Sequence, residues 1–426
     1  MMLECVKNSV LHFDGCNLVD VAAEYGTPLY VFSETDINNR FNELKKDFIE
    51  KYPKTRVAYA CKVFCVKAML ELVKASGMCI DVVSGGELYT AMQVNFPAER
   101  IEFNGNNKQR DEIEMAVEYG IGRIIIDGLK ELEMIEDVCR EKGKKMNVLY
   151  RVTPGVKSDS HDYIVTGKKD SKFGIPLDED VIMPAVKKAM DSEYVNLLGF
   201  HFHVGSQLLD NGSHLQALEI VLNLAKNVKE LLGFEIKEIN LGGGFGVKYI
   251  DEERKPFSYF LDPMMEKIYN FFDAEKMEHP AVVIEPGRSI VAEAGMQLYT
   301  IGQIKDIRDV RKYVSVDGGM PDNIRPALYQ AQYTAVFANR ADEVGNDVVT
   351  VCGKCCESGD ILIRDIKLPE AKTGDILAVK STGAYGYSMA SNYNKLPIPA
   401  VVFLKEGKSR LVVKRQTFED LISREI

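Results

Sequence analysis

Short apolar runs alternate with charged, helix-like segments between about residue 55 and residue 285. In chain order the runs are VAYACK (57–62), CIDVVS (79–84), IEFNG (101–105), RIIID (123–127), NVLYRV (147–152), LLGFHFHVG (197–205), EINLGGG (238–244) and AVVIEPG (281–287). Strands that each lead into a helix predict parallel βα units of an α/β protein, and eight such strands close a (β/α)8 barrel of the TIM type. An open, doubly wound sheet would produce the same alternation.

The segments between the apolar runs have the periodicity of amphipathic helices. Over residues 215–233 apolar side chains recur three or four positions apart, and residues 66–77 and 109–120 are similar. A glycine ends each pattern, where a left-handed residue usually follows a helix. These glycines are Gly77, Gly120 and Gly233.

Polar residues gather at the C-terminal ends of the predicted strands. They are Lys62, Asp81, Asn104, Asp127, Arg151, His203, the glycines at 242–244 and Glu285. A TIM-type barrel carries its active site on that face, so this distribution favours the closed barrel over the open sheet.

After about residue 286 the sequence becomes rich in β-type runs such as YVSVDGG, DVVTVCG, DILAVKST and PAVVFLKEGKSRLVVKRQ. We therefore expect a barrel over residues 36–283 and a second, mainly β domain of barrel or sandwich type. Residues 1–35 and 284–426 would form this second domain, with a strand from the N-terminal segment, and would complete the active site.

Composition narrows the class of partner. The chain has 426 residues, a net charge of −10 and 46% hydrophobic residues, which argues against binding to nucleic acid or to an anionic membrane surface. Nine cysteines without a paired CxxC framework argue against disulfides and favour a reducing cytoplasm. No stretch is apolar over the length of a membrane span. We expect a soluble cytoplasmic protein that acts on small molecules.

Lys62 is the first candidate for chemistry, because it lies between Cys61 and Cys65 at the end of an apolar run. A lysine in such a place usually extends its ammonium to water while its stem covers apolar surface. The alternative is an amine nucleophile, kept reactive by partial desolvation and able to form a Schiff base.

Two motifs follow the seventh and eighth predicted strands. The N–H groups of Gly242–Gly244 can approach a phosphate closely, although a plain tight turn has the same sequence. In IEPGRS, Glu285 can pair with a cationic ring nitrogen and Arg288 with a phosphate or carboxylate. A salt-bridged surface turn is the alternative for these two residues.

His201 and His203 are predicted to share one face of their strand, because strand side chains alternate. No acidic or cysteine residue at metal-ligand spacing completes a metal site, and a core histidine is the plainest interpretation. His203 can instead stack on a flat cofactor whose phosphate Ser206 helps to bind. Together with Lys62 and the glycines, these side chains imply pyridoxal phosphate, an electron sink for a carbanion at an amino-acid α-carbon.

The predicted β domain adds further candidates. Cys356 can be the acid that reprotonates such a carbanion, although most free cysteines are small buried hydrophobes. Tyr385, in the segment GAYGY, can reach a phosphate or a carboxylate. Arg325 and Tyr329 are four residues apart on a predicted helix and are candidates for carboxylate binding.

Eight motifs, taken together, resemble the diaminopimelate decarboxylase family, within the class of pyridoxal-phosphate decarboxylases that combine a barrel with a β domain. They are AYACK, RVTPGVKSDSHDYIVTGKKDSKFGI (151–175), HFHVGSQ, LGGGFG, EPGRSIV, DGGMPDNIRPALY, CESGD and GAYGYSMASNYN. They occur in the family's order over nearly the whole chain. DSKFG, CESGD and MASNYN are more similar to this family than to its ornithine or arginine relatives.

The resemblance implies decarboxylation of meso-2,6-diaminopimelate to L-lysine and CO2, the last step of lysine biosynthesis. It implies catalytic roles for Lys62, His203 and Cys356. The cofactor-binding positions that it implies are Lys62, Asp81, His203, Ser206, Gly242, Gly243, Gly244, Glu285, Gly287, Arg288 and Tyr385. The substrate-binding positions that it implies are Arg288, Arg325, Tyr329, Glu357 and Tyr385. It also implies a homodimer with shared active sites, in which the CES segment comes from the partner chain.

Some alternatives stay open at this point. The family's lysine motif usually continues with AN where this chain has VFC, and a shift of one residue would make Cys355 the acid in place of Cys356. Related decarboxylases of arginine, ornithine or carboxynorspermidine, or a non-catalytic homologue that binds pyridoxal phosphate, would share the same barrel. Arg325 and Glu357 distinguish these alternatives. Diaminopimelate has a distal carboxylate and a distal ammonium, which need an arginine and an acid. Either distal group left unpaired would cost roughly 1–3 kcal/mol.

Overall fold

The computed structural model describes residues 4–156 and 171–426, so residues 157–170 of the 151–175 motif lie outside the described residues. The chain packs into two compact units. The β unit consists of Met1–Arg40, Val247–Glu253 and Arg288–Ile426, and the barrel unit of Phe41–Gly246 and Arg254–Gly287. The domain boundaries expected from the sequence stay a prediction. Val247–Glu253 packs with the β unit although it lies inside the expected barrel range.

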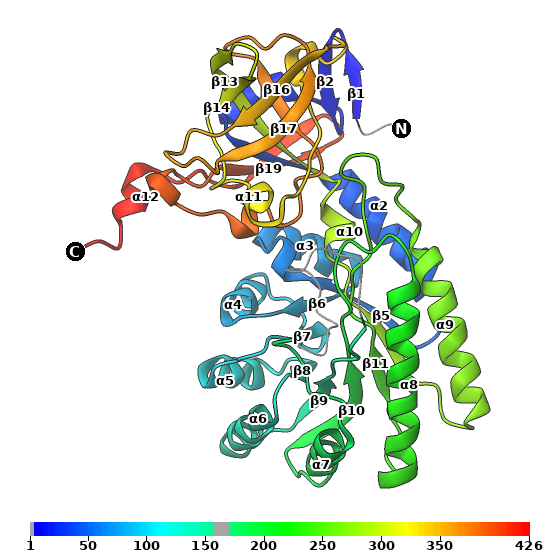
Figure 1. Ribbon diagram of the computed structural model, residues 1–426. Coiled ribbons are helices and arrows are strands. Elements are labelled where there is room, and N and C mark those ends of the chain that lie inside the picture. The colour runs from blue at the N-terminus through cyan, green and yellow to red at the C-terminus, as the bar shows by residue number, and fades with distance from the viewer. Residues whose placement is uncertain (1–3, 157–170) are drawn as a thin grey trace. The chain divides into compact units, whose positions relative to one another are not determined.

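The barrel unit contains a barrel of parallel strands with helices outside it (Figure 1). The barrel is closed, in the order β10-β11-β12-β5-β6-β7-β8-β9. The strands are β5 (Thr55–Ala60), β6 (Cys79–Val82), β7 (Ile101–Phe103), β8 (Arg123–Ile126), β9 (Met146–Arg151), β10 (Val195–His201), β11 (Glu238–Asn240) and β12 (Ala281–Ile284). The first and last strands in sequence, β5 and β12, pair in parallel and close the ring. The predicted (β/α)8 barrel is confirmed, and the open sheet is excluded.

The helices of the barrel unit are α3 (Lys67–Ser76), α4 (Gly85–Gln93), α5 (Arg110–Tyr119), α6 (Leu129–Lys142), α7 (Glu179–Met190), α8 (Gly212–Leu232) and α9 (Phe257–Ala274). The three helices predicted from periodicity are α3, α5 and α8. Gly77, Gly120 and Gly233 follow them with φ of +86°, +78° and +71°. Glycine adopts this left-handed backbone without a steric penalty, so the predicted helix ends are confirmed.

The barrel strands end earlier than the apolar runs suggested. β5 ends at Ala60 and β12 at Ile284, so Lys62 and Glu285 lie on the loops that follow the strands. β11 ends at Asn240 because the left-handed Gly242, with φ of +66°, cannot continue an extended strand. The expected strand ends at 62, 244 and 287 are therefore wrong by a few residues.

The β unit contains a nine-stranded sheet with the main order β17-β16-β14-β13-β4-β19-β20, in which β18 pairs with β13 and β15. Its strands are β4 (Leu29–Ser33), β13 (Gly295–Ile307), β14 (Arg311–Val316), β15 (Ala335–Phe337), β16 (Asp347–Cys352), β17 (Ile361–Leu368), β18 (Ile376–Val379), β19 (Ala400–Lys405) and β20 (Lys408–Val413). β4 comes from the N-terminal segment and pairs with β13 and β19. The expected mainly β domain with an N-terminal strand is confirmed.

A smaller sheet in the same unit joins β1 (Glu4–Lys7), β2 (Val10–Phe13) and β3 (Cys16–Asn17). The helices of this part of the chain are α1 (Leu18–Tyr25), α2 (Glu34–Leu44), α10 (Arg288–Val291), α11 (Arg325–Tyr329) and α12 (Phe418–Ile422). Val31, Leu298 and Val402, from three neighbouring strands, belong to its fully buried apolar core. In the parts of the chain that the structure describes, none of the helices combines the length and apolarity needed to cross a membrane.

Candidate active site

Three buried carboxyl groups meet at one end of the barrel strands. Asp81 lies on β6, Glu102 on β7, and Glu285 directly after β12. Their oxygens lie within 4.8 Å of one another, and all three side chains are buried. Like charges this close in a buried place cannot all be ionised at neutral pH, so the cluster retains protons.

Glu285 carries the negative charge of the cluster. Its Oε1 accepts hydrogen bonds from Asn104 Nδ2 (3.1 Å) and Asn240 Nδ2 (2.9 Å), and His201 Nε2 lies 2.9 Å from the same oxygen. Burial alone would raise the pKa of Glu285, but the nearby His201, Glu102 and Lys62 outweigh it and hold that pKa below its ordinary value. A carboxylate is therefore fixed at the mouth of the barrel.

The surroundings of the other two members of the cluster favour their protonated forms. Burial, and next the charge of Glu285, raise the pKa values of Asp81 and Glu102 well above their ordinary range. Asp81 Oδ1 accepts a hydrogen bond from Asn104 (2.8 Å), while its buried Oδ2 has no hydrogen-bond partner among the described residues. This site thus offers one carboxylate surrounded by donors, which suits a cationic ring nitrogen.

The two histidines have different environments. β10 ends at His201, so the strand alternation that predicted a shared face with His203 does not extend to the second residue. His203 lies on the following loop, where its Nδ1 accepts a hydrogen bond from Gly243 N (3.2 Å). Burial, and next Lys62, lower the pKa of His203 well below its ordinary value. Its imidazole is therefore neutral, with its hydrogen on Nε2.

Lys62 lies on a 3-10 turn, Cys61–Val63, that directly follows β5, and its side chain is half-buried. Its positive charge acts on Asp81, Glu285 and His203, so all four side chains share one electrostatic environment. This placement brings an amine to the carboxylate cluster, as a cofactor lysine requires.

Gly287 packs against the lysine turn. A Cβ on Gly287 would lie 2.8 Å from Val63 Cγ1 and 3.0 Å from Ala60 Cβ, and Ala60 N donates a hydrogen bond to Pro286 O (3.2 Å). Any larger residue at position 287 would push the two turns apart.

The glycine turn after β11 is in close contact with its neighbours. A Cβ on Gly243 would lie 2.2 Å from Glu285 O, and one on Gly244 would lie 2.6 Å from Gly205 O. The Gly242 and Gly243 amides already donate hydrogen bonds, to Asn240 Oδ1 (2.9 Å) and to His203 Nδ1. Of the three N–H groups predicted to face a phosphate, these two are therefore engaged within the protein, and the prediction is left to Gly244.

The loop that carries Ser206 packs on the same turn. Gly205 touches Gly244, and Leu208 N donates a hydrogen bond to Gly244 O (2.9 Å). Ser206 lies between these two contact points and is half-buried. The structure thus brings the predicted phosphate-binding serine and glycines together within the barrel unit.

In the β unit, two buried arginines surround one tyrosine. Arg288 Nη1 donates to Tyr249 Oη at 2.5 Å and Arg325 Nη1 donates to the same oxygen at 3.2 Å. Burial would raise the pKa of Tyr249, but Arg288 and Arg325 outweigh it and hold that pKa below its ordinary value. Arg325 also donates to Tyr333.

Arg325 has no carboxylate partner among the described residues, and its buried guanidinium donates to the phenol oxygens of Tyr249 and Tyr333, which hydrogen-bond it without neutralising its charge. Such a guanidinium is suited to binding an anionic group. Tyr329 shares α11 with Arg325 and is half-buried, but the partners of Arg325 are Tyr249 and Tyr333.

Tyr385 lies beneath Arg288, with the guanidinium carbon 4.9 Å from the centre of the ring. Its φ of +63° is unusual for a residue with a side chain and is often found at functional positions. The cation–π contact and the left-handed backbone fix the direction of this ring.

The two adjacent cysteines differ in their surroundings. Cys355 is half-buried and its amide donates to Asp360 Oδ2 (2.9 Å); burial, and next Asp360, raise the pKa of the Cys355 thiol to about 12. Cys356 is exposed, and its amide donates to Asn394 Oδ1 (2.8 Å). Tyr393 donates to exposed Glu357 (3.4 Å), so the MASNYN segment supports the CES loop.

Sequence reasoning missed four residues of these clusters. Glu102 is a lone acid inside an apolar run, a signal that could have been used. Asn240, Tyr249 and Tyr333 carry no comparable signal, because only the folded chain shows what each side chain contacts.

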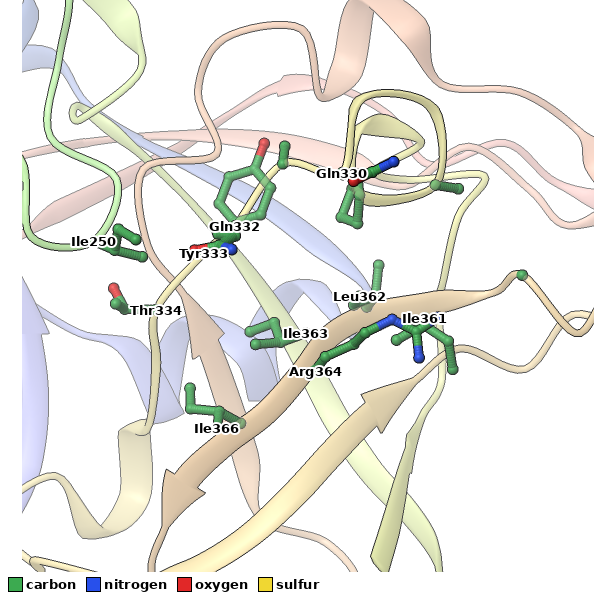
Figure 2. A pocket seen from close by; sticks show the side chains of 14 residues that line it. Ile250, Gln330, Gln332, Tyr333, Thr334, Ile361, Leu362, Ile363, Arg364 and Ile366 are labelled. Atoms are coloured by element: carbon green, nitrogen blue, oxygen red, sulfur yellow. The ribbon is translucent and has the colours of Figure 1, made fainter. Parts of the chain in front are cut away.

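A cavity of about 700 Å3 also occurs in the β unit, beside α11 and β17 (Figure 2). Its lining includes Ile250, Tyr333, Ile363 and Ile366, which Figure 2 shows around the same space, together with Arg364. None of the residues predicted from the sequence lines it. The candidate chemistry therefore lies in the polar clusters described above and not in this cavity, whose lining is part polar and part apolar.

Known proteins are similar to this chain over nearly its whole length. A family model described as "Pyridoxal-dependent decarboxylase, pyridoxal binding domain" matches residues 34–292. The diaminopimelate decarboxylase of Bacillus subtilis (strain 168) is 48% identical over 413 residues, which cover 97% of this chain and 94% of that protein. That of Staphylococcus aureus (strain COL) is 43% identical over 424 residues, 99% of each chain.

A solved structure is similar throughout. The diaminopimelate decarboxylase from M. jannaschii in co-complex with L-lysine superposes with a TM-score of 0.93 and 37% identity, covering 100% of this chain and 98% of that one. These matches and the clusters above lead to one assignment. The chain belongs to the diaminopimelate decarboxylase family of pyridoxal-dependent decarboxylases.

Proposed function

We propose that this protein removes the carboxyl group from one end of meso-2,6-diaminopimelate as CO2 and produces L-lysine, with pyridoxal phosphate as its cofactor. The observation that carries the substrate class is Arg325, a buried guanidinium held by two phenols and without a carboxylate partner among the described residues. Diaminopimelate has a distal carboxylate that such a group can bind, whereas ornithine and lysine do not.

The residues of the barrel unit fit pyridoxal phosphate. A half-buried amine, a buried carboxylate surrounded by donors and a glycine turn are the groups that its aldehyde, ring nitrogen and phosphate require. When bound, the cofactor accepts the electron pair that the departing CO2 leaves at the α-carbon.

Each side chain has a task toward the cofactor. Lys62 Nζ would hold the aldehyde carbon, and Glu285 would keep the ring nitrogen protonated because its carboxylate is oriented by Asn104, Asn240 and His201. The neutral imidazole of His203 would offer the ring a flat, uncharged surface. Asp81, Ser206, the Gly242–Gly244 turn, Gly287, Arg288 and Tyr385 complete the proposed cofactor contacts.

Cys356 supplies the proton that replaces the carboxyl group at the α-carbon. Its exposure supports this choice over Cys355, whose thiol faces Asp360 and is hard to ionise. Glu357 receives the distal ammonium and Arg325 the distal carboxylate, with Arg288, Tyr329 and Tyr385 as further contacts of the substrate.

We further propose that the protein works as a homodimer in the cytoplasm, with residues of the β unit and of the barrel unit acting on one substrate. All nine cysteines are free thiols, which suits a reducing compartment. Exposed Cys356 and Glu357 suit a loop that acts on a partner chain.

The test is release of CO2 and lysine from meso-diaminopimelate by purified protein with added pyridoxal phosphate, with ornithine and arginine in parallel. We expect lysine and CO2 from diaminopimelate and no turnover of ornithine or arginine. Turnover only of ornithine or arginine would overturn the roles of Arg325 and Glu357, and cofactor binding without any turnover would indicate a non-catalytic homologue.

A further inference from the structure

Asn240, the last residue of β11, is fully buried and uses its whole amide inside the barrel. Its Nδ2 donates to Glu285 Oε1 (2.9 Å) and to Glu102 Oε1 (3.2 Å). Its Oδ1 accepts a hydrogen bond from Gly242 N (2.9 Å). An amide has two N–H hydrogens, and here each one reaches a different carboxyl group.

The chemistry of these contacts requires an amide. A carboxylate at position 240 could still accept from Gly242 N, but it would lose both donors and add a fourth acid to the cluster of Asp81, Glu102 and Glu285. An apolar side chain would leave Gly242 N without its acceptor in a buried place, and it would remove the donors that reach Glu102 Oε1 and Glu285 Oε1.

Glu102, the second acceptor of Asn240, is itself fixed from inside the barrel. Arg123 Nη1 lies 3.5 Å from Glu102 Oε2, and Arg123 Nε lies 3.2 Å from Glu238 Oε1. All three of these side chains are buried, with exposed fractions of 8% or less. Asn240 therefore connects Glu102, which lies beside the buried Arg123, to Glu285.

We propose that Asn240 is a positioning residue that holds Glu285 and the Gly242–Gly244 turn at a fixed spacing for pyridoxal phosphate. The inference rests on the proposed roles of Glu285 at the ring nitrogen and of the turn at the phosphate. One side chain then sets both ends of the cofactor site, because its two N–H hydrogens orient the acid while its oxygen orients the first amide of the turn.

The test compares N240D with the wild type in cofactor affinity, measured on cofactor-free protein by the change in absorbance as pyridoxal phosphate is added. Because a buried polar group loses its partners, the affinity of N240D is expected to fall roughly ten- to a hundredfold. The pH at which the absorbance band of the bound cofactor changes is expected to shift as well, since the charge facing the ring nitrogen changes.

The matched control is N196D, on neighbouring strand β10, where exposed Asn196 donates to Asn147 Oδ1 (2.9 Å). It is expected to bind the cofactor like the wild type. The double variant N240D/E102Q returns one amide to the cluster and is expected to recover at least part of the lost affinity, which a merely unfolded protein would not do.

If circular dichroism shows that N240D does not fold, N240S gives the same comparison. The serine hydroxyl still offers an acceptor to Gly242 N, but it cannot donate to Glu102 and Glu285 at the same time. Wild-type affinity and an unchanged pH profile in the folded variant would overturn the inference. Because affinity is measured without substrate, failure of the wild type to decarboxylate diaminopimelate would count against the proposed function and not against this role of Asn240.

Discussion

Lys62 is the residue on which the cofactor assignment depends most directly. Lys62→Ala removes the amine that holds the aldehyde, so the absorbance band of lysine-bound pyridoxal phosphate is expected to disappear. The spectrum of purified protein with added cofactor checks this. Lys67→Ala, at the exposed start of α3, is the control and should keep the band. A band that survives in Lys62→Ala would contradict the role of Lys62.

The two adjacent cysteines give a second prediction for single residues. Cys356→Ala is expected to keep the cofactor and to lose on the order of a hundredfold or more in kcat, as general acids typically contribute. Cys355→Ala should change kcat little, because burial and the neighbouring Asp360 raise the pKa of the Cys355 thiol to about 12. Steady-state kinetics with diaminopimelate distinguishes the two variants. The reversed pattern would identify Cys355 as the proton donor in place of Cys356.

At the scale of the element, the N-terminus of α4 carries a pH dependence. Glu87 accepts a hydrogen bond from Val83 N (2.8 Å). Burial raises the pKa of Glu87 to about 7, and this effect outweighs the hydrogen bond from Val83 and the charge of Lys62, which both lower that pKa. An acid whose pKa is higher in the folded state than in the unfolded chain favours folding at low pH. Its contribution to stability therefore declines as pH rises from about 4.5 to about 7 and stays constant above that.

Glu87→Gln keeps the hydrogen-bond acceptor and cannot ionise. The melting temperature of the cofactor-free variant, relative to the wild type, should therefore be a few degrees higher at pH 8 than at pH 5. Thermal unfolding followed by circular dichroism at both pH values checks this. Glu71→Gln, on neighbouring α3, is the control and should show no such change. A difference between Glu87→Gln and wild type that does not vary with pH would disprove the assigned titration.

Whole elements could be predicted from the sequence because hydrophobic periodicity determines them locally. The strand at 123–127 and the helix at 215–233 need only the order of apolar and polar residues. Lys62, Glu285 and the 242–244 glycines could be named because each follows such a run.

The sequence could not predict which side chains contact one another in the folded protein. Asn240 is one polar residue before a glycine run, and its two carboxyl partners are distant in the sequence: Glu102 lies on β7 and Glu285 on the loop after β12. Tyr249 lies between barrel segments in the sequence, yet its partners Arg288 and Arg325 belong to the β unit. Such contacts arise from tertiary packing, for which local patterns give no signal.

For the whole molecule, the proposed dimer with shared sites can be tested by combining two different inactive variants in one heterodimer. Lys62→Ala lies in the barrel unit and Cys356→Ala in the β unit, and each variant alone should be nearly inactive. The two chains, carrying different affinity tags, are co-expressed, and the heterodimer is isolated through both tags in turn. If each site takes its lysine from one chain and its cysteine from the other, one site has both defects and the second has none.

Such a heterodimer should show about half of the wild-type activity per dimer, because a twofold assembly has two equivalent sites. If one chain supplied both groups, every site would carry one defect and the heterodimer would be inactive. If the protein were a monomer, no chain would be retained through both tags. A heterodimer of two Lys62→Ala chains, prepared in the same way, controls for carry-over of wild-type enzyme, since it should be inactive whichever chains supply the groups.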